Sequence, residues 1–284
     1  MLAPASLIMS AATRLTQLRG CVHHRQATVA GYTFHYYEGG SGDPLVLLHG
    51  LADDKNSFLA SAAKLTSKFR VILPDLAGHG DNEQAADRDY SVRGHVEALH
   101  GLFGELGLDR FHLGGNSMGG HTSAAYALRY PEQIASLILV NAPGAGKDTR
   151  PIYAGFGARM KTVEDFGAVL DRVYYQKPKL PGFIVQHMLN EMDKRFDHVN
   201  AMTQAVRDGE DLDLADRIAA ITQRTLVLWG KHDIVVPFDV AEAYTKKIPN
   251  AHLRRLDNAA HSPQLEIPGP VANEIETFLT TPPA

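Results

Sequence analysis

Five short and almost continuous apolar runs, each ending near Gly, Asp, Asn or Pro, constrain the fold of this chain more than any other feature. They cover residues 44–50, 69–75, 111–117, 136–143 and 225–233. Runs that are apolar on both faces are typical of parallel strands buried between two layers of helices. Segments of helical length alternate with them, at 55–67, 91–106, 118–130 and 238–247. The alternation predicts an α/β fold with a mostly parallel sheet, and residues 27–40 predict a two-stranded hairpin at its edge.

The alternation is interrupted once, between the fourth and fifth apolar runs. Residues 144–220 contain no strand-like run and carry aromatic and Met side chains at helical spacing, divided by Pro178 and Pro181. So long an insertion is expected to be a helical subdomain rather than a loop. These side chains are needed to pack such a subdomain, and part of the same surface is equally suited to lining an apolar pocket.

The N-terminal segment has a helical pattern of its own. Ile8, Ala11, Leu15 and Leu18 recur at helical spacing, and no basic residue precedes the apolar stretch, so a secretory signal is not expected. We expect an amphipathic helix that packs on the body of the protein, with contact to a membrane surface as the alternative. The expected domains are an extension over 1–27, a core over 28–143 and 221–284, and the insertion.

Composition excludes several classes of protein. The formal net charge is −4, which argues against a nucleic-acid partner held through phosphate contacts. The single cysteine, Cys21, cannot form an intrachain disulfide, and no Cys/His spacing is typical of a zinc site, so no metal site is expected. His23 and His24 are expected to be solvated surface residues. No apolar run is long enough to span a membrane, so a cytoplasmic or peripherally membrane-associated location is favoured over secretion.

The third apolar run ends in Gly115-Asn116-Ser117-Met118-Gly119, which is a G-x-S-x-G pattern between an expected strand and an expected helix. At such a turn a nucleophilic serine adopts a strained conformation, and side chains two positions away would collide with the adjoining strand and helix. Gly115 and Gly119 relieve that crowding. The pattern alone is a moderate signal, and its position between strand and helix makes Ser117 a strong candidate nucleophile.

A serine hydroxyl needs a base, and the base needs an acid to orient it. In this architecture the acid and then the histidine should follow later strands. Asp233 and His261 occupy those positions in that order. Taken alone, Asp233 is equally well explained as a turn carboxylate, and His261 as a histidine at a helix start. These explanations do not account for both residues following successive strands in the expected order.

Other acids and bases compete with this pair for the two roles. Asp257 precedes His261 by four residues but lies at the end of a preceding strand, away from the expected loop. Asp75 and Asp81 are expected to be structural, and His232 is expected to be an exposed loop residue.

An acyl-transfer site also needs donors for the developing oxyanion. One expected donor is the backbone N–H of Met118, directly after the nucleophile. The second is expected from the turn after the first apolar run, where His49-Gly50 leads to Leu51. His49 is interpreted as a residue that shapes this turn.

These motifs together resemble the α/β-hydrolase superfamily over residues 28–280. The matching stretches are LLHGLADDKNSF, VILPDLAGHG, HLGGNSMGGHTSAAYALRYPEQIASLILVNAPG, LWGKHDIVVP and AAHSPQLE. They are most similar to bacterial family V lipases and esterases and to monoacylglycerol lipases. The resemblance implies an eight-stranded sheet with a helical lid after the sixth strand, and a carboxylic ester hydrolase without a cofactor. It also implies Ser117, Asp233 and His261 as the triad, and the Leu51 and Met118 amides as the oxyanion hole.

The chain departs from the family pattern in places. Ala260 stands where these enzymes usually have Gly before the catalytic His, and Asn82 replaces a commoner small residue after GHG. Both departures bear on substrate preference rather than on the triad. The expected substrate is an ester of a medium or long acyl chain or a monoacylglycerol, while acyl length and oligomeric state stay open.

Two alternatives remain open. One is a hydrolase of C–C bonds in meta-cleavage products, which shares the fold and the order of the triad. Those enzymes usually have a bulky aromatic residue after the catalytic His, where this chain has Ser262. The other is a non-catalytic ligand-binding protein of the same fold, because fold alone does not imply activity.

Overall fold

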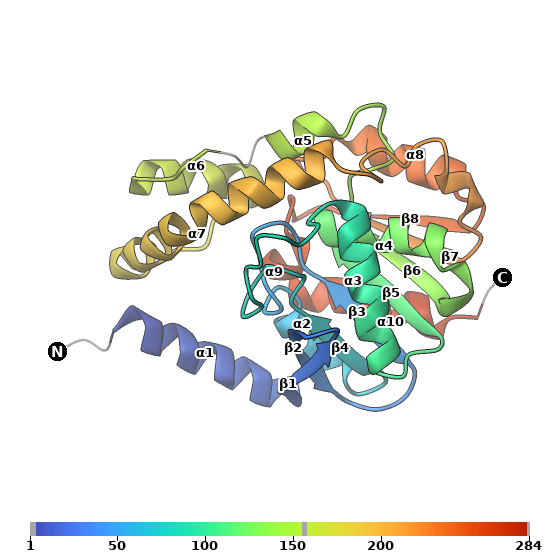
Figure 1. The fold of residues 1–284 in the computed structure, drawn as a ribbon, viewed down its shortest axis with the longest axis horizontal. Helices are drawn as coiled ribbons and strands as arrows, with labels where there is room; N and C mark the ends of the chain where they lie inside the picture. Colours follow the sequence, from blue (N-terminus) through green and yellow to red (C-terminus); the bar gives the residue numbers. More distant parts are fainter. Residues whose placement is uncertain (1–3, 155–157, 283–284) are drawn as a thin grey trace.

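The computed structural model describes residues 4–154 and 158–282. Eight strands form one sheet in the order β1-β2-β4-β3-β5-β6-β7-β8 (Figure 1). Their bounds are β1 Val22–Val29, β2 Tyr32–Gly39, β3 Pro44–Leu48, β4 Arg70–Pro74, β5 Phe111–Asn116, β6 Ile134–Val140, β7 Arg224–Gly230 and β8 Ala251–Leu256. β2 is antiparallel to both of its neighbours, and every pair from β4 to β8 is parallel. The predicted α/β class, parallel sheet and edge hairpin are confirmed.

Helices cover both faces of this sheet. They are α2 Leu59–Leu65, α3 Val92–Glu105, α4 Met118–Arg129, α8 Phe238–Lys247, α9 Pro263–Glu266 and α10 Pro268–Thr280. Alternate residues of each central strand enter one of two buried apolar clusters: in β3, Val46 and Leu48 pack with α3, α4 and α8, whereas Leu45 and Leu47 pack with α2 and α10. Burial on both faces explains why these strands appear in the sequence as continuous apolar runs.

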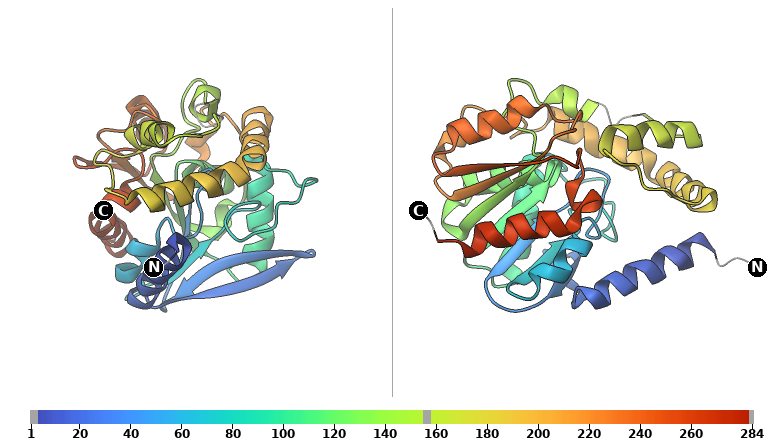
Figure 2. Two further views of the ribbon diagram at one scale, coloured as in Figure 1. Left: turned by 90° about the vertical axis from the view of Figure 1, so that its left-hand side faces the viewer. Right: turned by 180° about the vertical axis from the view of Figure 1, so that it is seen from behind.

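The segment between β6 and β7 is helical. It contains α5 Arg150–Ala154, α6 Val163–Val173, α7 Gly182–Asp208 and a short 3-10 turn at Ile218–Ala220. Thr162 and Asp165 form a capping box that fixes the start of α6. Phe166 of α6 packs against Val185 and Leu189 of α7 in a small apolar cluster separate from the core. Figure 2 shows α6 and the start of α7 extending beyond the sheet, on the side where α1 also projects.

The N-terminal helix, α1 (Ala5–Arg19), forms where the periodicity predicts it, but its apolar face is not packed. Leu7 is 60% exposed and Leu18 is 68% exposed, and none of the helix residues is buried. The expectation that this face packs on the body is therefore wrong: the helix contacts α2, α7 and β1, but it leads away from the sheet (Figure 1) and its large apolar side chains stay exposed. β1 begins at Val22, upstream of the boundary expected at residue 28. Within the described residues, no helix has both the length and the apolar character needed to cross a membrane.

Candidate active site

The turn between β5 and α4 holds Ser117 in a strained backbone conformation. β5 ends at Asn116, α4 begins at Met118, and Ser117 between them has φ 53° and ψ −122°. A non-glycine residue in this region costs of order 1–3 kcal/mol, and such residues cluster at functional sites. A Cβ atom on Gly119 would lie 2.4 Å from the carbonyl oxygens of Leu48 and His49, so the tight turn requires glycine there.

His261 and Asp233 meet near the carboxyl ends of the strands. Nδ1 of His261 lies 2.9 Å from Oδ2 of Asp233, and the two side chains are 5% and 0% exposed. The second carboxylate oxygen, Oδ1, accepts hydrogen bonds from the backbone N–H groups of Val235 and Val236 at 2.7 and 3.1 Å. The carboxylate can accept a hydrogen bond from Nδ1 only when Nδ1 carries the proton. Nε2 of a neutral His261 therefore has a free lone pair.

Asn141, at the end of β6, supports the same carboxylate and was missed by sequence reasoning. Its Nδ2 donates a hydrogen bond to Oδ2 of Asp233, and its Oδ1 accepts one from the N–H of Gly230 at 3.3 Å. Asn141 has φ 48°, a left-handed conformation that asparagine tolerates better than most residues. The sequence offered one weak signal, a polar residue directly after the apolar run of β6.

A second amide side chain links the serine turn to the histidine loop. Nδ2 of Asn116 donates to the carbonyl oxygen of His261 at 2.9 Å, and Oδ1 of Asn116 accepts from Nε2 of Gln264 at 3.1 Å. The residue that precedes Ser117 therefore holds the backbone of His261. Three of the residues singled out by the sequence, Ser117, Asp233 and His261, are thus brought to one region by Asn116 and Asn141.

The turn after β3 lies against the serine. A Cβ atom on Gly50 would come within 3.3 Å of Cβ of Ser117. Nε2 of His49 accepts a hydrogen bond from the N–H of Leu76 at 2.9 Å, so the proton is on Nδ1, which donates to the carbonyl oxygen of Gly50 at 2.7 Å. Because the C=O and the following N–H of one planar peptide point in opposite directions, His49 directs the N–H of Leu51 away from itself.

The inserted helices reach this region through α6. The carbonyl oxygen of Val173 accepts hydrogen bonds from the N–H groups of His261 and Ser262, at 3.1 and 3.2 Å. Glu266 joins the same two segments, because one carboxylate oxygen accepts from the N–H of Ala260 and the other from the N–H of Tyr175, each at 2.7 Å. The histidine loop is therefore held on one side by the sheet and on the other by the insertion.

The pKa values of two acidic side chains near the Gly50-Leu51 turn are raised, which favours their neutral forms. Burial, together with the charge of Asp54, raises the pKa of Asp53. Burial, with Asp53 and Glu266 nearby, raises the pKa of Tyr174 to about 12. The shift of Asp53 favours the neutral form of the carboxyl group that lies three residues after Gly50.

The rival acids and bases lie elsewhere. Asp257 is exposed and pairs with Lys231, with Oδ1 and Nζ 3.0 Å apart. Asp75 is buried and pairs with Lys55, which also contacts Asp81. The ring of His232 stacks on Tyr175 with their centroids 3.9 Å apart.

Comparison with known proteins places the chain in a family. A family model described as the alpha/beta hydrolase fold matches residues 43–268. The chain is 32% identical over 255 residues to Lipase 3 of Moraxella sp. (strain TA144), covering 84% of this chain and 78% of the lipase. It is 30% identical to 2-hydroxymuconate semialdehyde hydrolase of Pseudomonas putida, covering 90% of this chain and 93% of the relative.

A solved structure agrees with this placement. The crystal structure of a membrane phospholipase A, described as a bacterial virulence factor, superposes with a TM-score of 0.90 at 28% identity, covering 97% of this chain and 91% of that one. The family match includes the serine turn, the histidine loop and the insertion between β6 and β7. The chain therefore belongs to the α/β hydrolase fold family, among members that resemble bacterial lipases and esterases.

Proposed function

We propose that this protein is a serine hydrolase that cleaves carboxylic esters, with Ser117 as nucleophile, His261 as general base and Asp233 as the acid that orients it. The observation that carries the proposal is the buried hydrogen bond between His261 Nδ1 and Asp233 Oδ2, in the loops next to the strained Ser117. The lipase and phospholipase relatives support ester hydrolysis.

In the first half of the reaction, Oγ of Ser117 attacks the ester carbonyl carbon while Nε2 of His261 takes the hydroxyl proton. Asp233 holds the ring with Nδ1–H toward itself and stabilises the imidazolium that forms. His261 then gives the proton to the leaving alcohol as the C–O bond breaks, which leaves an acyl group on Ser117. In the second half, His261 takes a proton from water, water attacks the acyl carbon, and the acid leaves as Ser117 regains its proton.

The oxyanion formed in each half needs preorganised donors. We assign this role to the N–H groups of Met118 and Leu51. Met118 begins α4, where first-turn N–H groups have no partner within the helix. His49 turns the peptide that carries the N–H of Leu51, and each such donor is worth about 3 kcal/mol in the transition state.

We propose that residues 144–220 form a lid over this site. The hydrogen bonds from His261 and Ser262 to Val173 support a position beside the catalytic histidine. The names of the lipase and phospholipase relatives support a medium or long acyl chain, or a monoacylglycerol, as the substrate.

Peripheral contact with a membrane surface through α1 fits this substrate class. The exposed side chains of Leu7, Ile8, Leu15 and Leu18 lie within a stripe of roughly 100° around the helix, because successive residues rotate by about 100°. A lipid surface would cover this stripe and present lipid esters to the enzyme. Such contact is consistent with the similarity of this fold to a phospholipase A that is itself described as a membrane protein.

Hydrolysis of p-nitrophenyl esters with acyl chains of two to sixteen carbons, measured beside Ser117→Ala, tests the proposal. We expect activity to rise toward medium or long chains and to fall by about 10⁵-fold or more in the variant. Ser41→Ala, an exposed change in the loop between β2 and β3, should retain activity as the matched control.

Other outcomes distinguish the alternatives. Ser117-dependent cleavage of a vinylogous diketone without ester hydrolysis would favour the second candidate, a C–C bond hydrolase, which the Pseudomonas putida relative supports. Failure of a fluorophosphonate probe to label Ser117, with no hydrolysis of either substrate, would favour a ligand-binding protein.

A further inference from the structure

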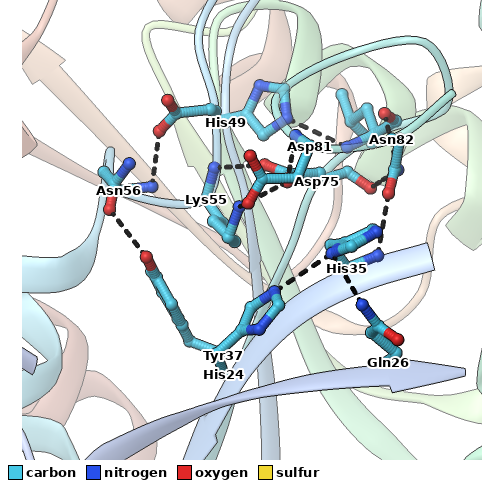
Figure 3. Close-up of polar contacts among 12 residues, drawn as sticks. His24, Gln26, His35, Tyr37, His49, Lys55, Asn56, Asp75, Asp81 and Asn82 are labelled. Carbon is cyan, nitrogen blue, oxygen red and sulfur yellow. Dashed lines mark hydrogen bonds and ion pairs between the residues drawn. The ribbon is translucent and has the colours of Figure 1, made fainter. Parts of the chain in front are cut away.

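Two histidines on the edge hairpin stack against each other, and a carboxylate from a distant loop lies beside them. His24 is on β1 and His35 is on β2, where the register pairs His35 with Gln26, so the two histidines are diagonal neighbours on one face. Nε2 of His24 lies 3.1 Å from Nδ1 of His35, and the rings stack with their centroids 5.2 Å apart. Asp81, from the loop after β4, approaches the same point (Figure 3).

This grouping stands out within residues 4–154 and 158–282. It is the one place there where three ligand atoms from His, Cys, Asp or Glu side chains lie within 4.8 Å of one another. Sequence spacing did not predict it, because His24 and His35 are separated by a turn and Asp81 comes from another element. Only the hairpin register and the path of the loop after β4 bring the three together.

We propose that His24, His35 and Asp81 form a binding site for a divalent transition-metal ion, of which Zn²⁺ is the test case. Ligand atoms about 2.1 Å from one metal are roughly 3.0–3.5 Å apart when adjacent, so the two imidazole nitrogens already have the required separation. A carboxylate oxygen of Asp81 lies within 4.8 Å of both nitrogens, so coordination requires a rotation of this side chain toward them. Two imidazoles and one carboxylate suit Zn²⁺, Cu²⁺ or Ni²⁺, whereas Mg²⁺ and Ca²⁺ prefer oxygen ligands.

Two carboxylates and one ammonium group lie beside the proposed site. Nζ of Lys55 lies 2.7 Å from Oδ2 of the buried Asp75 and 2.6 Å from Oδ2 of Asp81, so two carboxylates surround one ammonium group. Asp81 can keep Lys55 on one oxygen and offer the other to the metal, because each carboxylate oxygen accepts independently.

The histidines are also suited to act as ligands, since a metal binds only the neutral imidazole. The hydrogen bond between Nε2 of His24 and Nδ1 of His35 requires a lone pair on one of these two nitrogens. In the absence of metal, Nδ1 of His35 lies within hydrogen-bonding distance of Nε2 of His24 and, at 3.4 Å, of Nε2 of Gln26. Binding a metal replaces these contacts with two coordination bonds. The site would join the edge hairpin to the loop after β4, through residues that the proposed catalytic groups do not use.

Calorimetric titration of Zn²⁺ into the untagged full-length chain, after treatment with a chelator, tests the site. We expect one zinc ion per chain, and affinity at least about tenfold weaker in His24→Gln and in His35→Gln, because loss of a direct ligand costs no less than loss of a group that hydrogen-bonds to a ligand. His23→Gln, on the same strand but facing the opposite side, and Cys21→Ser should bind as the wild type does. Mg²⁺ should not compete.

Electron paramagnetic resonance of bound Cu²⁺ gives an independent readout. We expect superhyperfine splitting from two nitrogen ligands in the wild type and its loss in the double variant His24→Gln, His35→Gln. The proposal is overturned if the wild type shows no saturable zinc binding, or if this double variant binds as tightly as the wild type. Ester hydrolysis is measured separately, so either result leaves the proposed activity untouched.

Discussion

At the scale of single residues, the carboxylate of Asp233 accepts hydrogen bonds from donors outside its own loop as well as within it. The loop contributes two backbone N–H groups, and Asn141 contributes a side-chain donor from the neighbouring strand end. Because Asn141 also accepts from the N–H of Gly230, it connects the ends of β6 and β7 on either side of the proposed acid. It acts through Asp233 and is therefore a positioning residue.

Replacing Asn141 with glycine tests this role without adding backbone strain, since glycine adopts the same positive φ freely. We expect kcat for a p-nitrophenyl ester to fall by about tenfold while KM changes little, because the lost hydrogen bond orients Asp233 and does not touch substrate. Asn190→Ala, an exposed change on α7, serves as the control. An unchanged kcat in Asn141→Gly would show that the loop N–H groups alone hold the carboxylate.

At the scale of elements, the sequence predicts more of the framework than of the network inside it. Continuous apolar runs located the central strands because each strand is buried on both faces, as Val46 and Leu47 on opposite sides of β3 illustrate. Asn116, Asn141 and Glu266 could not be assigned in this way. Their hydrogen-bond partners depend on which loops lie together at the strand ends. A single polar residue after an apolar run does not show which loops those are.

The N-terminal helix shows the limit of periodicity. The spacing of Ile8, Ala11, Leu15 and Leu18 predicts a helix with an apolar face, and α1 has one. Spacing says nothing of what covers that face, because packing on the body and contact with lipid require the same pattern. In the structure the large apolar side chains of this face are exposed.

Co-sedimentation with anionic phospholipid vesicles tests whether lipid covers α1. We expect the double variant Leu15→Gln, Leu18→Gln to bind vesicles about tenfold more weakly than the wild type. Each substitution removes apolar surface that the lipid would otherwise cover. Met9→Gln, on the side of α1 away from the stripe, is the matched control and should bind normally. Equal binding by the double variant and the wild type would remove lipid contact from the proposal.

At the scale of the whole molecule, stability should depend on buried neutral histidines. Burial lowers the pKa of His95 and of His121 to about 4, from 6.5 in the unfolded chain. Between these two values the unfolded state binds more protons than the folded state, so the free energy of unfolding rises with pH. The full contribution is present above about pH 6.5 and is lost as the pH falls toward 4.

Urea denaturation at several values between pH 4 and pH 7 measures this dependence. We expect the free energy of unfolding to fall on acidification, with a slope of up to about 1.4 kcal/mol per pH unit for each histidine. His95→Leu should show a shallower dependence, because one of the buried rings with a lowered pKa is removed. Replacement of the exposed His252 with glutamine should leave the slope unchanged. A slope in His95→Leu equal to that of the wild type would contradict this origin.

The two hydrogen bonds from the His261 and Ser262 amides to Val173 have a consequence for how substrate could enter. Val173 ends α6, so any motion that lifts α6 from the core removes the one carbonyl oxygen that accepts from both N–H groups of the backbone that carries the proposed base. An open form would admit a large substrate but hold the imidazole of His261 less firmly. A closed form would hold the imidazole firmly but exclude a large substrate. Access and reactivity would then trade against each other in a single equilibrium, and turnover would be fastest with substrates whose binding restores the closed form.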